Sequence, residues 1–287
     1  MKPDRRWHLI QFKLQEHRII KTFELFRKYN IEPILIKGWA AARNYPNRED
    51  RVFLDTDICV APHEYEKSLK ILAGKEEKNL MVDLHNGLRH LDTLGWDELF
   101  ENTVTVRLHE TDIRILRPED HLRVLCVHWL NDGASYKGRL WDIFYAVENR
   151  PTDFNWNRCL NVVDSKRRKW IICAIGLAHR YFGLELKNTP ISAEAELIPR
   201  WVIQAVEKEW ADETRLRRLH DCLKDRKEFV RQLKKRFPPN PIQATIDTNG
   251  EFDDKPRIFY QIGNILIRVK PSIQRFVTRI YQDFLRK

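Results

Sequence analysis

The stretch that most constrains this chain is residues 34–60, which read ILIKGWAAARNYPNREDRVFLDTDICV. Its first three residues form a short apolar run that predicts a buried strand, and a Lys-Gly pair then breaks that run. A helix-like segment follows over residues 39–44, and a second predicted strand then carries Asp55 and Asp57. A strand, a glycine turn, a helix and a second strand in this order indicate a folded domain built around a sheet.

The two aspartates of this stretch predict a cation site. Because strand side chains alternate between the two faces of a sheet, Asp55 and Asp57 should point the same way. Two like charges held this close in a half-buried strand are costly unless a cation neutralises them, and Mg²⁺ prefers carboxylate oxygens together with phosphate. An isolated Asp-x-Asp is also common as a polar strand end or turn, so the motif depends on the residues that precede it.

Those preceding residues predict an anion site. Gly38 lets the backbone approach a ligand closely, and a helix that starts at Trp39 would aim its free N–H groups and positive dipole end at an anion. Lys37 adds a positive charge at the same place. We therefore expect a phosphate cradle and a metal site at neighbouring strand ends.

This order of elements resembles the nucleotidyltransferase fold of the DNA polymerase β superfamily. Within that superfamily the chain resembles an uncharacterised bacterial nucleotidyltransferase family, over about the first half of its length. The residues that carry the resemblance are Lys37-Gly38, Tyr45-Pro46, Arg51, residues 55–60 (DTDICV), residues 82–85 (VDLH), His128 and residues 140–142 (LWD). In the wider superfamily the glycine is usually followed by Ser or Gly, whereas Trp39 follows it here.

The resemblance implies transfer of an NMP unit from an NTP to an acceptor, with release of pyrophosphate. Asp55 and Asp57 would ligate two Mg²⁺ ions, with Mn²⁺ as the alternative metal, and Asp83 on the next strand would supply the third carboxylate. Asp83 could also take the proton of the acceptor. The implied nucleotide-binding residues are Lys37, Gly38, Trp39, Arg51, Arg139 and Asp142. The candidates for the acceptor side are His85 and His128.

Several of these residues also have a structural interpretation. For Arg51, a bidentate salt bridge that fixes the aspartate strand explains the residue as well as a contact with the triphosphate does. His85 lies two residues beyond Asp83 and shares its strand face, where it could orient Asp83, meet the acceptor or be a core histidine. His128, Arg139 and Asp142 could line the nucleotide or acceptor side of an active-site cleft, or they could form hydrogen bonds at a domain interface.

The hydrophobic pattern predicts an α+β protein with two domains. A small mixed-sheet nucleotidyltransferase domain with an N-terminal helix would span residues 1–117, and a mainly helical domain would span residues 118–287. In the first domain we expect helices at 5–29, 62–72 and 96–101, a third strand at 80–84, and a hairpin of 103–108 with 112–116. In the second we expect helices at 118–130, 139–149, 156–163, 169–181 and 194–210, a basic helix at 213–236, a polar loop at 237–256 and a helical pair at 258–285 split at Pro271.

Composition predicts a folded cytoplasmic protein. A hydrophobic content of 43%, with 9 Trp and 14 Phe, is enough for a substantial core. The five cysteines are scattered without C-x-x-C spacing, so we expect buried thiols rather than disulfides or zinc ligands. No stretch approaches the roughly 18 apolar residues of a membrane span, and the N-terminus has no apolar signal region.

The net charge of +10 and the pI near 9.4 suit an anionic partner. Charges of both signs are abundant, however, so charge only supports that prediction. The basic segment 213–236 fits either an RNA- or membrane-facing helix or an ordinary amphipathic helix. The acceptor could be RNA, a protein or a small molecule, and the base of the NTP is open.

Two other functions compete with nucleotidyl transfer. A non-catalytic nucleotide- or RNA-binding module on the same fold would be favoured if a carboxylate were missing, and all three candidates are present. A D-x-D glycosyltransferase normally places the motif after a long nucleotide-binding segment, whereas only about fifty residues precede it here.

Overall fold

The computed structural model describes residues 5–87, 93–212, 214, 216–223 and 225–268. The described residues of 1–128 and 138–192 form one compact unit, and those of 129–137 and 193–287 form a second. The first unit contains the sheet and all the candidate site residues that are discussed below. The division into a nucleotidyltransferase domain up to residue 117 and a helical domain after it stays a prediction.

A five-stranded mixed sheet has the strand order β3-β2-β1-β5-β4. Strand β1 pairs antiparallel with β2 and parallel with β5, β2 pairs parallel with β3, and β4 pairs antiparallel with β5. The strands are β1 (Ile34–Leu35), β2 (Thr56–Val60), β3 (Val82–Asn86), β4 (Val104–Leu108) and β5 (Thr111–Ile115). The sheet ends at Ile115 and helices follow it, which confirms the predicted α+β class.

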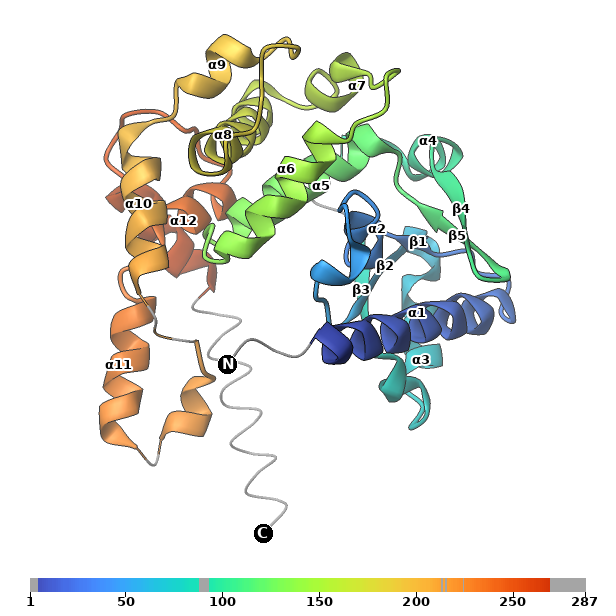
Figure 1. Ribbon diagram of the computed structural model, residues 1–287. Helices are drawn as coiled ribbons and strands as arrows, with labels where there is room; N and C mark the ends of the chain where they lie inside the picture. Colours follow the sequence, from blue (N-terminus) through green and yellow to red (C-terminus); the bar gives the residue numbers. More distant parts are fainter. Residues whose placement is uncertain (1–4, 88–92, 213, 215, 224, 269–287) are drawn as a thin grey trace. The chain divides into compact units, whose positions relative to one another are not determined.

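Both faces of the sheet are covered, because alternate residues of the strands are apolar on each side. On one face, Leu35 and Ile58 lie in a core cluster with Phe23 of helix α1 (Arg5–Arg27), which lies across the strands in Figure 1. On the other face, Ile34 and Cys59 pack in a cluster with residues of helices α4 (Trp96–Glu101) and α5 (Pro118–Asn131). The second face is the one that carries the candidate site.

Most of the predicted helices form. The segment expected at 62–72 is a 3₁₀ turn, η2 (Pro62–Glu64), followed by α3 (Tyr65–Leu72). After the sheet come α5, η4 (Lys137–Arg139), α6 (Leu140–Glu148), α7 (Trp156–Leu160) and α8 (Ser165–Phe182). No helix in the described part of the chain combines the length and apolarity needed to cross a membrane. All five cysteines are buried and free, as predicted.

Three predicted boundaries in the second half are wrong. The helix expected over 194–210 is two helices, α9 (Ser192–Glu196) and α10 (Arg200–Ala211), because Pro199 has no N–H for a helix interior. The basic helix expected over 213–236 is reduced to η5 (Leu219–Cys222) and α11 (Arg226–Arg236) in its described part. Asp225 starts α11 by accepting hydrogen bonds from the backbone N–H groups of Lys227 and Glu228.

The third error concerns the segment expected to be a polar loop at 237–256, which contains helix α12 (Pro241–Asp247). The Asn240 side chain caps α12, and Pro241 occupies a first-turn position where its missing N–H costs nothing. Within the stretch expected to be a loop, the Asn240-Pro241 pair is therefore a helix start. Residues 258–268 are helical, and the second member of the predicted C-terminal pair lies outside the described residues.

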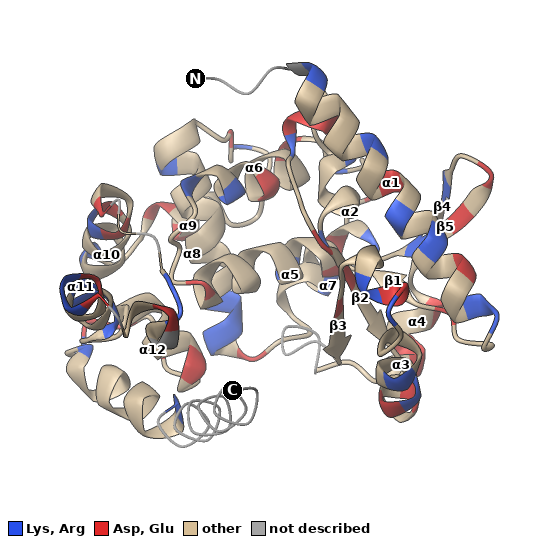
Figure 2. Ribbon diagram, turned by 90° about the horizontal axis from the view of Figure 1, so that it is seen from below, with Lys and Arg blue, Asp and Glu red and all other residues tan. Residues whose placement is uncertain are grey.

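Charged residues of both signs are interspersed along α1, α3 and α11 (Figure 2). Helix α11 is mostly basic, with Glu228 as its acidic residue. Its Lys235 already forms ion pairs with Glu209 at 2.7 Å and with Asp212 at 2.9 Å. The basic character of α11 is therefore partly neutralised within the second unit.

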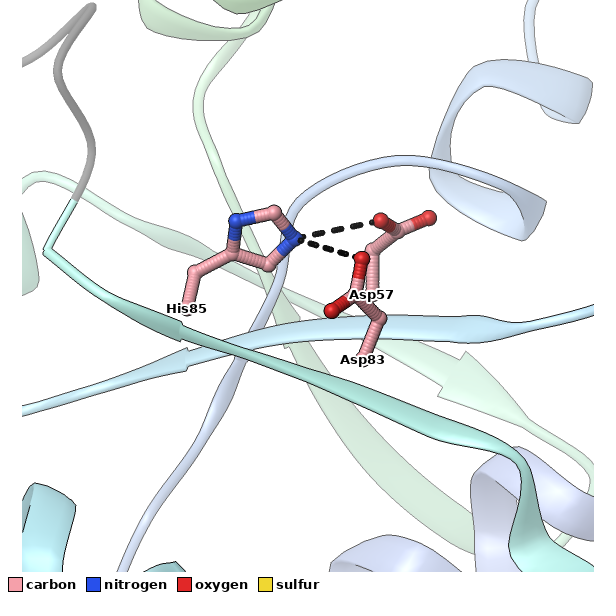
Figure 3. A group of neighbouring side chains, drawn as sticks. All are labelled: Asp57, Asp83 and His85. Atoms are coloured by element: carbon pink, nitrogen blue, oxygen red, sulfur yellow. Dashed lines mark hydrogen bonds and ion pairs between the residues drawn. The ribbon is translucent and has the colours of Figure 1, made fainter. Parts of the chain in front are cut away.

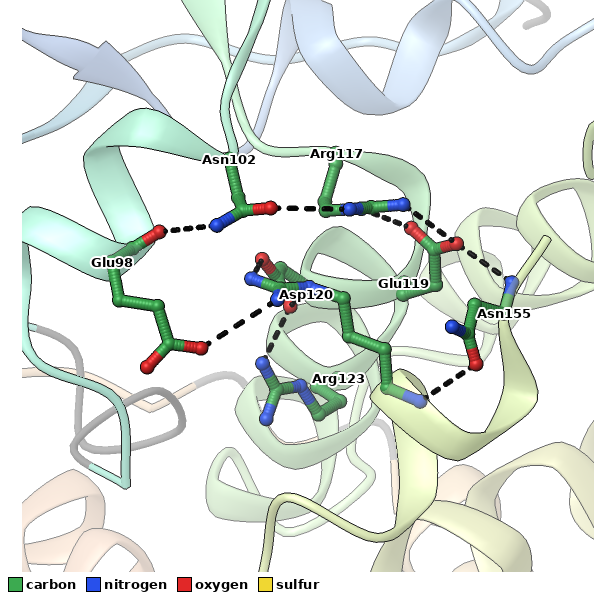
Figure 4. A network of polar contacts seen from close by, with 8 residues as sticks. Glu98, Asn102, Arg117, Glu119, Asp120, Arg123 and Asn155 are labelled. Atoms are coloured by element: carbon green, nitrogen blue, oxygen red, sulfur yellow. Dashed lines mark hydrogen bonds and ion pairs between the residues drawn. The ribbon is translucent and has the colours of Figure 1, made fainter. Parts of the chain in front are cut away.

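A buried charged network joins α4, α5 and α7 (Figure 4). Asp120 accepts a hydrogen bond of 2.6 Å from Nη2 of Arg123 and two more, of 3.2 and 2.8 Å, from Arg158. Both Asp120 and Arg123 are fully buried. Next to them, Glu119 pairs with Arg117 at 2.7 Å. Buried charged side chains of α5 are thus held both by each other and by Arg158 of α7.

Candidate active site

The Lys37-Gly38 turn connects β1 to helix α2 (Trp39–Ala42), as the sequence predicts. Gly38 has φ 59° and ψ −113°, a backbone conformation that residues with a Cβ rarely adopt. A Cβ at this position would also lie 3.1 Å from the ring of Phe53. Both the backbone and the packing therefore require glycine here.

Helix α2 is a single turn, and all four of its residues are buried. The Trp39 side chain is 1% exposed and lies in the core, where its Nε1–H donates to Oε1 of Glu16 at 3.2 Å. Its indole therefore does not face a ligand, and only the backbone N–H of Trp39 is left for a phosphate. Nucleotide binding by Gly38 and Trp39 stays a prediction.

Paired strands bring Asp57, Asp83 and His85 together. In the parallel register of β2 and β3, Asp57 lies opposite Asp83, and His85 follows two residues later on the same face. The Nε2 atom of His85 lies 3.2 Å from Oδ1 of Asp57 and 3.4 Å from Oδ2 of Asp83 (Figure 3). One possible ligand atom from each of the three residues lies within 4.8 Å of the others. Asp55 lies just before β2 and is exposed, so the predicted strand starts one residue later than we expected.

Lys37 and two further residues form a basic group beside Asp57. The Lys37 Nζ atom is 2.6 Å from Oδ1 of Asp57 and 3.4 Å from Nε2 of His128. The same His128 nitrogen lies 3.0 Å from Nη1 of Arg139. The structure thus groups His128, which we expected on the acceptor side, with two residues that we expected to bind the nucleotide.

The pKa values show how these charges interact. Burial by itself raises the pKa of Asp57, but its hydrogen bond with His85 and the nearby Lys37 ammonium outweigh burial and lower that pKa to about 2. Burial lowers the pKa of His85, but hydrogen bonds to Asp57 and Asp83 outweigh it and raise that pKa to about 9.

The two remaining carboxylates shift in opposite directions. The hydrogen bond with His85 lowers the pKa of Asp83. In contrast, partial burial and the neighbouring charges of Asp57 and Asp83 raise the pKa of Asp55, even with Lys37 nearby. Three carboxylates therefore share two cationic groups, and Asp55 carries the unrelieved repulsion.

Arg51 and Asp142 form a buried bidentate salt bridge, with N–O distances of 3.1 and 2.8 Å. The Tyr45 hydroxyl donates to the same carboxylate at 2.6 Å. This contact joins the loop before β2 to α6, and it is the structural alternative that the sequence left open for Arg51. The sequence assigned no role to Tyr45. The Tyr45-Pro46 pair, one of the motifs that carry the family resemblance, was the only sequence signal for a role of Tyr45.

One of three comparisons with known proteins found a match. Residues 3–183, more than half of the chain, match the model of a family described as uncharacterised nucleotidyltransferase. The chain belongs to this family. Neither the search of curated proteins nor the search of solved structures found a match.

Proposed function

We propose that this protein is a metal-dependent nucleotidyltransferase of the polymerase β type, which moves an NMP unit from an NTP to an acceptor. The observation that carries the proposal is the pairing of Asp57 with Asp83 on the adjacent strands β2 and β3. Lys37, which follows the neighbouring strand β1, contacts Asp57. Family membership supports the reaction type. The two competing functions, a non-catalytic nucleotide- or RNA-binding module and a D-x-D glycosyltransferase, have no comparable support.

The residues at this site fit a divalent cation. Asp57 and Asp83 present carboxylate oxygens on one face, and Asp55 lies close enough that their charges raise its pKa. Oxygen ligands of this kind are those that Mg²⁺ and Mn²⁺ bind in proteins. When bound, such ions stabilise the charge that develops on the attacking and leaving oxygens of a displacement at phosphorus.

The other polar residues divide between two tasks. Lys37, His128 and Arg139 form the basic group that would hold the triphosphate and the departing pyrophosphate. Asp83 has a side chain that is 56% exposed, so an acceptor hydroxyl can reach it. As the acceptor oxygen bonds to the α-phosphorus and the bond to pyrophosphate breaks, Asp83 would take the acceptor's proton.

Isothermal titration calorimetry with an NTP and Mg²⁺ tests the nucleotide site. The double variant Asp55→Asn with Asp57→Asn should lose Mg²⁺-dependent NTP binding, since two of the three carboxylate charges at the cation site are removed. Asp254→Asn, an exposed aspartate of the second unit, is the matched control and should bind normally. An unchanged NTP affinity in the double variant would rule out this site.

The acceptor requires a separate experiment. Incubation of the protein with labelled NTPs and a cell extract, followed by separation of RNA, protein and small molecules, would show which fraction takes up label. If RNA is the acceptor, its affinity should fall steeply as salt rises, because phosphate contacts release counterions. Label found only in protein or metabolites would exclude RNA. The absence of pyrophosphate release with every fraction would favour a non-catalytic binding module.

A further inference from the structure

We propose that His85 is a metal ligand together with Asp57 and Asp83, and that its imidazole makes this site prefer Mn²⁺ over Mg²⁺. The inference takes the location of the site from the proposed function and adds the identity of a ligand and of the metal. From the sequence, His85 could orient Asp83, meet the acceptor or be a core histidine. In the structure its Nε2 points at the carboxylates of both Asp57 and Asp83.

The backbone fixes this arrangement. Asp57 and Asp83 are opposite each other in the parallel register, and the two-residue period of β3 puts His85 on their face. The imidazole then reaches back along the strand, so that Nε2 lies 3.2 and 3.4 Å from the two carboxylates, as Figure 3 shows. Neighbouring ligand atoms around an octahedral ion with bonds of 2.1 Å are about 3 Å apart, so small shifts of these side chains suffice to bind one.

The graded exposure of the three residues gives an ion a route to the site. The Asp57 side chain is 7% exposed and forms the buried side of the cluster, whereas His85 and Asp83 are 26% and 56% exposed. An ion arriving from solvent would therefore meet Asp83 and His85 before it reaches Asp57. This order suits a site that loads from solution rather than one sealed during folding.

Ligand chemistry decides the metal. Carboxylate oxygens bind Mg²⁺ and Mn²⁺ alike, but an imidazole nitrogen favours transition ions and contributes little to Mg²⁺. A set of two carboxylates and one imidazole therefore suits Mn²⁺, which accepts both kinds of ligand. A set made of Asp55, Asp57 and Asp83 alone would give no such preference.

Calorimetric titration of the full chain with MnCl₂ and with MgCl₂, without nucleotide, tests this preference. The Lys37 ammonium contacts Oδ1 of Asp57, so the metal must compete with it and the titration should reach millimolar concentrations. We expect wild type to bind Mn²⁺ at least about tenfold more tightly than Mg²⁺. His85→Asn should lose most of that difference, while its Mg²⁺ affinity changes by less than about threefold. His63→Asn, at an exposed histidine, is the matched control and should behave as wild type.

A second measurement on wild type keeps the test valid if His85→Asn does not fold. Substoichiometric Mn²⁺ should broaden the imidazole NMR signals of His85 before those of His63, because a paramagnetic ion relaxes the nuclei of its own ligands most strongly. Equal affinities for the two metals in wild type, or an Mn²⁺ preference that survives in His85→Asn, would overturn the inference. So would imidazole signals of His85 that broaden no earlier than those of His63.

Failure of this inference and failure of the proposed function give different results. If wild type releases pyrophosphate but binds both metals equally, the transferase stands and His85 is not a ligand. If Mn²⁺ binds through His85 but no acceptor fraction supports pyrophosphate release, the metal site stands and the transferase does not.

Discussion

The Asp57 cluster (Asp57, Asp83, His85 and Lys37) and the Asp120 cluster (Asp120, Arg123 and Arg158) use the same kinds of side chains but differ in charge balance and exposure. In the Asp120 cluster one fully buried carboxylate meets two guanidinium groups. In the Asp57 cluster and its neighbour Asp55, three carboxylates share one ammonium and one imidazole, and Asp83 is open to solvent.

Under the proposed function, this difference separates a stabilising cluster from a catalytic one. Removing one member of a buried ion pair leaves an unpaired charge in the interior, which is strongly destabilising. Removing a carboxylate from a crowded acidic site relieves repulsion, so stability should change little while function is lost. Two substitutions of the same type, one in each cluster, should therefore have opposite consequences.

The largest effect on free energy is expected in the Asp120 cluster. Asp120→Asn leaves the guanidinium group of Arg123 without its carboxylate partner and leaves Arg158 with only the more distant Glu98, at 3.7 Å. Two nitrogens of Arg123 already have no hydrogen-bond partner among the described residues. We expect the free energy of unfolding to fall by about 3–5 kcal/mol. Urea denaturation measures this change, with Asp254→Asn as the exposed control. A loss below about 1 kcal/mol would show that the cluster is not a main source of stability.

The next largest effect is kinetic and concerns Asp83. If Asp83 takes the acceptor's proton, Asp83→Asn should slow pyrophosphate release by about 10² or more, equivalent to about 2.7 kcal/mol in the barrier. NTP binding should remain, and the free energy of unfolding should stay within about 0.5 kcal/mol of wild type. Pyrophosphate release at the wild-type rate would show that the third carboxylate lies elsewhere. A loss of stability in Asp83→Asn as large as that expected for Asp120→Asn would contradict the contrast between the two clusters.

The smallest effect concerns His121, a buried neutral group next to the Asp120 cluster in sequence. Burial lowers the pKa of His121 to about 4, and its Nε2 has no hydrogen-bond partner among the described residues. Between pH about 6.5 and about 4 the unfolded chain binds one more proton at this residue than the native protein does. The stabilising contribution is therefore present above pH 6.5 and is lost as the pH falls, by up to about 1.4 kcal/mol per pH unit.

Urea denaturation at a series of pH values checks this prediction. His121→Leu should flatten the dependence of the unfolding free energy on pH across that window, whereas His63→Asn should leave the slope unchanged. The same slope in His121→Leu and in wild type would mean that His121 is protonated in the native protein. The Asp120 cluster would then have a further positive charge beside it on α5.

Much of the local structure was predictable because its causes act over a few residues. Apolar periodicity predicts α1, α4, α5 and the β4–β5 hairpin, and strand alternation puts Asp83 and His85 on one face. The glycine of the Lys37-Gly38 turn is explained mainly by its own backbone conformation. The errors near Pro199, Asp225 and Asn240 are also local, since each is a helix-start signal that a longer apolar or charged pattern obscured.

The partners of the site residues, in contrast, follow from how distant elements pack. Arg51 and Asp142 are 91 residues apart, so nothing in either local pattern shows that they form one salt bridge. Likewise, the sequence does not show that Trp39 is buried against Glu16, or that Arg123 lies in the interior. The turn, the strand faces and most helices were predictable from local sequence, because those depend on neighbours along the chain. The packing of distant elements decided which charges are neutralised and which remain available for chemistry, because an ion pair depends on distance in space.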